Sequence, residues 1–222
     1  MKLLLLRHSG GFEHSYLPNA EVAIKDIGKE SGLFEASTTC QCQRINAETL
    51  AKLDVLAFAT TGELPFDDAQ KQAILKFVRG GKGFFGIHNA ADTCYEWAEY
   101  GEMLGGYFKG HPWSQEVTVN VEDPDHPATR CLGDPFEVYD EIYTFKNWDR
   151  SKTHVLMSLE HSSVDMSKGN REDNDYALGW CHSYGKGRVM YTALGHPDEL
   201  WSQPWFREHI LGCIKWVGRI ED

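Results

Sequence analysis

The feature that most constrains the fold is a set of short, apolar segments separated by helical patterns in the first half of the chain. Residues 2–6 include four consecutive leucines, and residues 54–59 and 84–87 are almost as apolar. Uninterrupted apolar runs of this length are typical of parallel strands that are buried on both faces. Residues 34–39 predict a further, shorter strand.

The segments between these strands predict helices over residues 17–30, 46–53 and 67–79. The first carries an apolar stripe at helical spacing. The last begins with Asp67 and Gln70, which are spaced as in a capping box. Strands that alternate with helices are joined by right-handed crossovers, so the first half of the chain predicts a parallel sheet.

The second half has a different pattern, in which apolar and polar residues alternate. Strands with one solvated face are therefore predicted over residues 115–121, 136–145, 154–160 and 176–183. Residues 184–187 predict a hairpin turn into the strand 188–194, and a last helix is predicted over 202–217. The polar stretch 161–175 is expected to be a surface loop or lid. We expect one α/β domain over residues 1–222, with antiparallel strands added to a mostly parallel sheet.

Charge and composition exclude several classes of protein. The net charge of −11 arises without a cluster of basic residues, which argues against nucleic acid or an anionic membrane as partner. No segment approaches the roughly 18 apolar residues of a membrane span, and Arg7 ends the first apolar run too early for a signal peptide. The six cysteines are expected to be buried thiols. We therefore expect a soluble cytoplasmic protein.

Polar residues follow the predicted strands at their carboxyl ends, where open parallel sheets bind ligands. The residues so placed include His8, His14, Thr61, Glu63, His88, Asn89, Asp92 and His196. The chain has ten histidines, more than structural roles alone require. We expect one cleft at this edge of the sheet, lined by His8, His88, His111, Glu141 and His196.

His88 has the most distinctive local sequence. It lies in the segment Gly86-Ile87-His88-Asn89-Ala90, whose small residues permit a strained strand-to-helix turn like a nucleophile elbow. We predict a strained backbone at His88 and a side chain that points toward His196 or a shared metal. As a rim side chain, it should be replaceable by alanine without loss of the fold. The alternative is a histidine that only caps the following helix.

An ordered series of motifs resembles the ThuA-like (trehalose utilisation) family. The motifs are Gly86–Asp92, Trp97, Tyr100, Leu104–Phe108, His111-Pro112, His126-Pro127, Asp140–Tyr143 and Gly187–His196. The resemblance covers nearly the whole chain. It implies a three-layer, flavodoxin-like fold of the class I glutamine amidotransferase type and a role in sugar catabolism.

The wider amidotransferase superfamily gives a second comparison. The segment Gly195–Glu199 resembles its catalytic His-Pro-Glu segment with one residue inserted, and Thr61-Gly62 corresponds to its oxyanion glycines. The elbow cysteine, however, is His88, and an imidazole cannot form a glutamyl thioester. Cys94, expected in or near the following helix, cannot substitute for it. The chain is therefore not expected to be a glutaminase.

The remaining polar residues predict acid-base or metal chemistry. The candidate catalytic residues are His88, Asp92, His111, Glu141 and His196. Asp140 and Glu141 are adjacent on a strand, so only one of them can face the pocket, and we choose Glu141. The same histidines with a carboxylate could instead hold a catalytic divalent metal such as zinc. Their spacing in the sequence favours neither alternative.

Substrate binding is expected to involve His8, His14, Thr61, Trp97, Trp113 and Tyr143. Sugars stack on aromatic rings, and Trp97 and Trp113 are the first candidates for such contacts. Four further histidines and one arginine are expected to have structural roles, namely His126, His154, His182, His209 and Arg188.

Two functions from different classes fit these residues. The first is an enzyme, a hydrolase, lyase or isomerase, that acts on a keto-glucoside or on a disaccharide such as a trehalose derivative. The second is a non-catalytic sugar-binding or regulatory domain that has lost amidotransferase activity. Catalysis would require pocket histidines with carboxylate partners, whereas a binding domain would need mainly aromatic rings and amides. A homo-oligomer is compatible with both.

Overall fold

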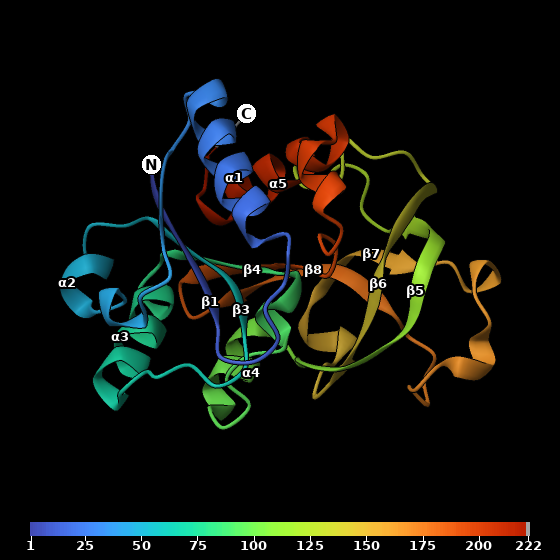
Figure 1. Ribbon diagram of the computed structural model, residues 1–222, viewed down its shortest axis with the longest axis horizontal. Coiled ribbons are helices and arrows are strands. Elements are labelled where there is room, and N and C mark those ends of the chain that lie inside the picture. The colour runs from blue at the N-terminus through green and yellow to red at the C-terminus, as the bar shows by residue number, and fades with distance from the viewer. Residues whose placement is uncertain (221–222) are drawn as a thin grey trace.

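The computed structural model describes residues 1–220, and within this range nine strands form one mixed sheet (Figure 1). The order of the strands is β2-β1-β3-β4-β9-β8-β7-β5-β6. Helices cover both faces of its parallel part, which gives the three layers that the sequence predicts. Within residues 1–220, the buried hydrophobic side chains form one continuous core around this sheet.

The parallel part of the sheet contains the strands that the apolar runs predict. It consists of β2 (Glu35–Thr39), β1 (Lys2–Ser9), β3 (Val55–Thr61), β4 (Gly83–Ile87) and β9 (Gly187–Thr192). The residues of β3 and β4 are all buried, as expected for strands covered on both faces. Their carboxyl ends meet along one edge, and the turns after β1, β4 and β9 lie there.

Antiparallel strands extend the sheet beyond β9. They are β8 (Ala177–Tyr184), β7 (His154–Leu159), β5 (Tyr107–Val121) and β6 (Phe136–Lys146). The alternating pattern predicts only residues 115–121 of β5. The first part of β5 escapes the pattern because the register with β6 shifts between Phe108 and Gly110 and again before Trp113, which interrupts the alternation.

Two layers of helices pack on the parallel strands. The helices α1 (Leu17–Ser31) and α5 (Pro204–Val217) lie together on one face, and α3 (Asp68–Arg79) and α4 (Ala98–Leu104) lie on the other (Figure 1). The short α2 (Ala47–Leu50) packs against α3. The predicted capping box at the start of α3 is confirmed, since Asp67 accepts from the Gln70 amide and Gln70 accepts from the Asp67 amide.

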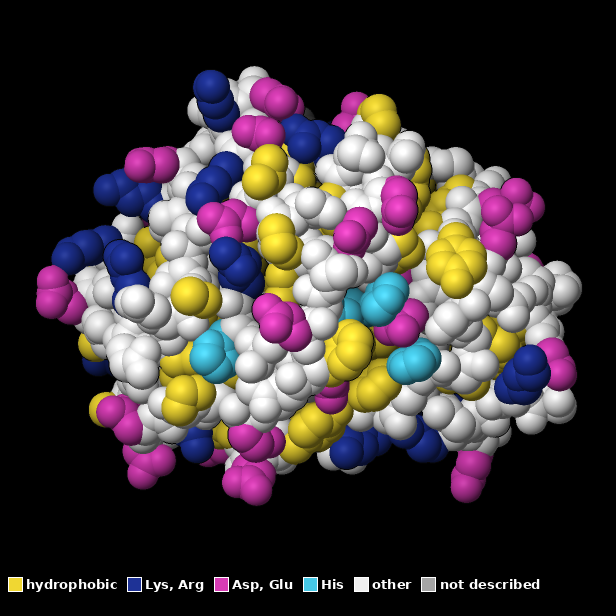
Figure 2. Space-filling model, viewed as in Figure 1, with side chains coloured by type: hydrophobic (Ala, Val, Ile, Leu, Met, Phe, Trp, Pro, Cys, Tyr) yellow, Lys and Arg dark blue, Asp and Glu magenta, His cyan; other side chains and the backbone are white. Residues whose placement is uncertain are grey.

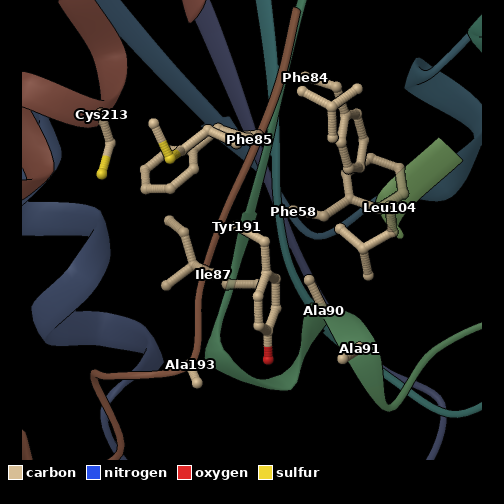
Figure 3. Packing of buried hydrophobic residues seen from close by; sticks show 14 of the residues in the cluster. Phe58, Phe84, Phe85, Ile87, Ala90, Ala91, Leu104, Tyr191, Ala193 and Cys213 are labelled. Atoms are coloured by element: carbon tan, nitrogen blue, oxygen red, sulfur yellow. The ribbon is translucent and has the colours of Figure 1, made fainter. Parts of the chain in front are cut away.

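The core is densest where β4 and β9 lie side by side. Figure 3 shows the Tyr191 ring of β9 between Ile87 and Ala90, with its hydroxyl directed toward the turn that follows β4. A Cβ at Gly86 would lie 2.5 Å from Leu104 Cδ1, so any larger residue there would have to displace the Leu104 side chain. The end of β4 is thereby held rigidly by packing from both helical layers.

Two expectations from composition can be compared with the fold. In the described part of the chain, no helix is both long and apolar enough to cross a membrane. The six cysteines are all free thiols, and most are buried, although Cys40 is exposed.

Candidate active site

The turn after β4 is built around His88. This residue has a φ of +42°, opens the short 3₁₀ turn His88–Ala91 and is completely buried. The predicted strained elbow is therefore confirmed. Its Nδ1 lies 2.6 Å from the Ala193 carbonyl oxygen, and Tyr191 donates a hydrogen bond of 2.7 Å to the His88 carbonyl. Because a carbonyl only accepts hydrogen bonds, Nδ1 carries a proton, and Nε2 is the nitrogen that has the lone pair in the neutral imidazole.

Asn89, the next residue, connects the elbow to the loop before α1. Its side chain accepts a hydrogen bond of 2.6 Å from the Tyr16 hydroxyl and contacts His14 Nδ1 at 3.2 Å. The His14 ring is thereby held against the elbow. The rings of His14, His88 and His196 form a triangle in which each pair of centroids is 5.3 Å apart.

Glu141 lies at the centre of the histidines. Its Oε2 lies 3.1 Å from His196 Nδ1 and 3.7 Å from His88 Nε2, and its Oε1 lies 4.0 Å from His111 Nε2. The Nδ1 atom of His196 and the Nε2 atom of His88 are buried and have no hydrogen-bond partner. Potential ligand atoms of His14, His88, Glu141 and His196 all lie within 4.8 Å of one another. We call these four residues the histidine–glutamate cluster.

Asp140 fixes the backbone next to the cluster. It is completely buried and accepts hydrogen bonds from the backbone amides of Gly195, at 2.8 Å, and His196, at 3.2 Å. The choice of Glu141 as the pocket carboxylate matches the geometry. Asp140 instead orients the turn that carries His196.

Burial and neighbouring charges shift the pKa values in this region. Burial, and then the nearby His88 and His196, lower the pKa of His14 to about 3. Burial raises the pKa of Asp140 to about 6, although its amide donors oppose the shift. Burial alone would raise the pKa of Glu141, but its close contacts with His196 and His88 hold it below its usual range. The contact with Glu141 raises the pKa of His196. The cluster therefore combines a carboxylate with buried imidazoles.

A pocket opens from the cluster to the surface. Its volume is about 330 Å³, and its lining consists of Ser15, Ser114, Tyr139, Glu141, His196, Pro197, Asp198 and Glu199. Figure 2 shows histidine side chains beside acidic side chains on this face of the molecule. Tyr139 is 57% exposed and is the aromatic residue of this lining. Sequence reasoning missed it, although it lies two positions before Glu141 on β6 and therefore on the same face of the strand.

Most of the predicted substrate-binding residues have other surroundings. His8 Nδ1 bonds to the Cys40 carbonyl at 2.8 Å, and His8 is not part of the cluster. Trp97 packs in the core near Phe66 and Tyr100, and Trp113 is 1% exposed. Both tryptophans are thus core residues, because burying the large apolar surface of an indole ring stabilises the fold more than leaving it at a rim.

The remaining predicted residues lie around the elbow. Thr61 is buried and donates to the Phe12 carbonyl, and Asp92 accepts a hydrogen bond from Tyr95. Tyr143 packs directly on His88, with the ring centroids 4.2 Å apart, and forms the wall behind the cluster. His111 lies beside Glu141 but outside the cluster. It is more exposed than the cluster histidines, with 43% of its side chain accessible.

The features of an amidotransferase site are not present at this elbow. The Gly62 amide, at the position of an oxyanion glycine, donates to the Asp92 carbonyl at 2.7 Å and so is occupied. Cys94 lies near α4, just before its first turn, as expected, and burial raises the pKa of its thiol to about 12. The thiolate that would attack glutamine is thus strongly disfavoured.

The comparisons with known proteins show the family of the chain. The profile of the ThuA family, described as trehalose utilisation, matches residues 2–217. The chain belongs to the ThuA family. No curated protein sequence matches it.

Solved structures with the ThuA-like fold resemble the chain over nearly its full length. A putative ThuA-like protein from Bacteroides uniformis ATCC 8492 is 24% identical, with a TM-score of 0.80, and the match covers 97% of this chain and 90% of that chain. One from Parabacteroides merdae ATCC 43184 is 17% identical, with a TM-score of 0.75 and coverages of 98% and 89%.

PurLQS from Thermotoga maritima is a more distant likeness. It is 16% identical, with a TM-score of 0.58, and the match covers 98% of this chain and all of that one, at 100%. This likeness fits the glutamine amidotransferase-like fold that the sequence predicts. The ThuA family membership in turn supports a role in trehalose utilisation at the level of the family.

Proposed function

We propose that this ThuA-family chain is an enzyme of carbohydrate catabolism that acts on a keto-glucoside or on a disaccharide such as a trehalose derivative. The observation that carries the proposal is Glu141, which lies within 4.0 Å of imidazole nitrogens of three histidines at the bottom of an open pocket. A carboxylate with this many imidazole partners is more than sugar binding alone requires. It is typical of sites that transfer protons or stabilise charge.

The site has a more buried and a more accessible part. In the first, the histidine–glutamate cluster places imidazoles and a carboxylate where a keto or hydroxyl oxygen of the sugar would enter. In the second, His111 has 43% of its side chain accessible and lies 4.0 Å from Glu141, so it can reach a bound substrate. A keto group makes the neighbouring carbon-bound proton more acidic, so these two parts together suit cleavage or isomerisation beside a carbonyl.

The pocket also fits a small polar ligand. Its volume of about 330 Å³ lies within the range of small-molecule sites, near the lower end. Most of its lining side chains carry hydroxyl, carboxyl or imidazole groups, which hydrogen-bond to sugar hydroxyls, and Tyr139 offers a ring face. We extend the proposal to a cytoplasmic protein, since free thiols are the rule in that compartment.

A sugar-binding or regulatory domain is the alternative function. A binding domain would need mainly aromatic rings and amides, and the first candidates for sugar stacking, Trp97 and Trp113, are both buried in the core. Without these rings, the aromatic surface of the pocket is reduced to Tyr139. The polar cluster therefore supports the enzyme over the binding domain.

Turnover of keto-glucosides, including a keto-derivative of trehalose, tests the proposal. We expect His111→Gln and Glu141→Gln to reduce kcat by about 10²–10⁴-fold, because each removes a group that moves a proton or stabilises charge. His161→Gln serves as the control, since His161 lies in a surface turn outside the cluster. Binding of these sugars without turnover by the unaltered protein would instead support the binding domain.

A further inference from the structure

We infer that His14, His88, His196 and Glu141 form a binding site for one divalent transition-metal ion such as zinc. The inference concerns the same pocket as the proposed function. It does not depend on the sugar, because metal binding is measured without substrate. It also replaces the ligand set that the sequence suggests, since His14 belongs to the group and the exposed His111 does not.

The spacing of the rings supports this inference. A tetrahedral ion with metal–nitrogen bonds of about 2.05 Å separates its ligand atoms by about 3.4 Å and the centroids of its imidazole rings by about 5.2 Å. The three histidine rings of the cluster are each 5.3 Å apart. Glu141 Oε2 lies 3.1 Å and 3.7 Å from two of the histidine nitrogens. Small side-chain rotations would therefore bring four ligand atoms around one ion.

Unpaired lone pairs point to the same position. Nδ1 of His88 donates to the Ala193 carbonyl, so Nε2 of the neutral ring can only accept a hydrogen bond, and it has no hydrogen-bond partner. This nitrogen lies 3.7 Å from the Glu141 carboxylate, which is also an acceptor. His88 is completely buried, so this nitrogen is not exposed to bulk solvent. Two facing acceptors are stabilised by a positive charge between them, which a divalent cation supplies.

His14 completes the set through its second nitrogen. Nδ1 contacts the Asn89 side chain, so Nε2 is the nitrogen that remains. A metal-bound Nε2 requires Nδ1 to donate its proton, and Asn89 satisfies this when its amide oxygen faces His14. The Tyr16 hydroxyl allows that orientation because it can accept from the amide nitrogen as well as donate to the oxygen.

The surroundings of the ligands are typical of a metal site. The Ala193 carbonyl fixes the ring of His88, and Asp140 fixes the backbone of His196 through its amide. Such outer contacts orient metal ligands and select the required tautomer. Three imidazoles and one carboxylate suit zinc and neighbouring first-row ions. The pocket beside Glu141 and His196 gives a substrate oxygen access to the ion.

Metal titration of the full-length protein tests the inference. The protein is stripped with a chelator and then titrated with Zn²⁺ by calorimetry and with Co²⁺ by visible absorption. We expect one equivalent of each ion and a Co²⁺ spectrum of low coordination number. Glu141→Gln and His196→Ala should weaken Zn²⁺ binding by about 100-fold or more, since even outer-shell changes cost 10–100-fold. His161→Gln, the surface control, should bind like the unaltered protein.

Two results would overturn the metal site. One is the absence of stoichiometric binding by the unaltered protein, and the other is unchanged affinity in both Glu141→Gln and His196→Ala. Sugar turnover is measured on the same samples. Turnover by a protein that binds no stoichiometric metal would overturn this inference and leave the proposed function standing. Stoichiometric metal binding without turnover of any of these sugars would overturn the proposed function and leave the metal site standing.

Discussion

At the scale of single residues, His88 combines a strained backbone with a fully buried side chain. Its φ of +42° is unfavourable for any residue with a Cβ, and its Nδ1 is needed by the Ala193 carbonyl. Sequence reasoning places His88 on the rim and therefore expects alanine to leave the fold intact. The rim position is wrong, because the side chain is 0% exposed. Alanine would leave both a cavity and an unpaired carbonyl, so a loss of stability is expected.

Replacing His88 with alanine and with glycine separates these two effects. Both variants should be less stable than the unaltered protein by about 2–4 kcal/mol, the combined cost of a cavity and a lost buried hydrogen bond. His88→Gly should be the more stable of the two by about 1 kcal/mol, because glycine adopts positive φ without strain. Urea unfolding measures both differences. An alanine variant as stable as the glycine variant would show that the turn is not strained.

At the scale of elements, the sequence predicts what depends on local pattern and misses what depends on long-range contact. The buried strands β1, β3 and β4 have apolar runs that only a double-sided burial explains. The first part of β5 was not predicted, because bulges interrupt its alternation. A helix was expected after the elbow, but the pattern did not give the bounds of the short α4.

In the candidate site, too, local pattern predicts some positions and long-range contacts decide the others. Strand ends indicate which edge of the sheet carries the polar residues, and strand alternation identifies Glu141. No local pattern shows that His14 lies beside His88, that His8 turns to Cys40, or that Trp113 is buried. These positions depend on how loops pack across the edge, which sequence spacing does not encode.

Helix α5 offers a prediction about packing between elements. A Cβ at Gly212 would lie 2.0 Å from the Pro127 carbonyl oxygen, a backbone atom that cannot rotate away. Helix propensity alone would make Gly212→Ala stabilising by about 1 kcal/mol. We expect the opposite sign, a loss of about 2 kcal/mol, since the helix must move off the loop that carries Pro127. Thermal and urea unfolding measure the change. Glu208→Ala, at an exposed position of α5, is the control and should have little effect.

At the scale of the whole molecule, buried histidines make stability depend on pH. Burial lowers the pKa of His126 and of His209 to about 4 in the folded protein, from the ordinary value of 6.5. The unfolded chain therefore takes up protons first as the pH falls. The stability that these residues contribute is fully present above pH 6.5 and is lost as the pH falls toward 4.

Urea unfolding at pH 7.5, 6 and 5 tests this dependence. The free energy of unfolding should decrease through this series, and His209 alone accounts for a loss on the order of 3 kcal/mol by pH 4. In His209→Gln, which is less stable at pH 7.5 because it breaks the bonds to Ala128 and Thr192, the decrease should be smaller. An identical decrease in both proteins would assign the acid sensitivity to other groups.

The four side chains of the histidine–glutamate cluster come from widely separated parts of the chain. His14 precedes α1, His88 follows β4, Glu141 lies on the edge strand β6 and His196 follows β9 in the middle of the sheet. A chain leaving the ribosome therefore has no reactive constellation until the segment after β9 has emerged and folded. A ligand that needs all four side chains could therefore bind only after the last quarter of the chain has folded onto the rest.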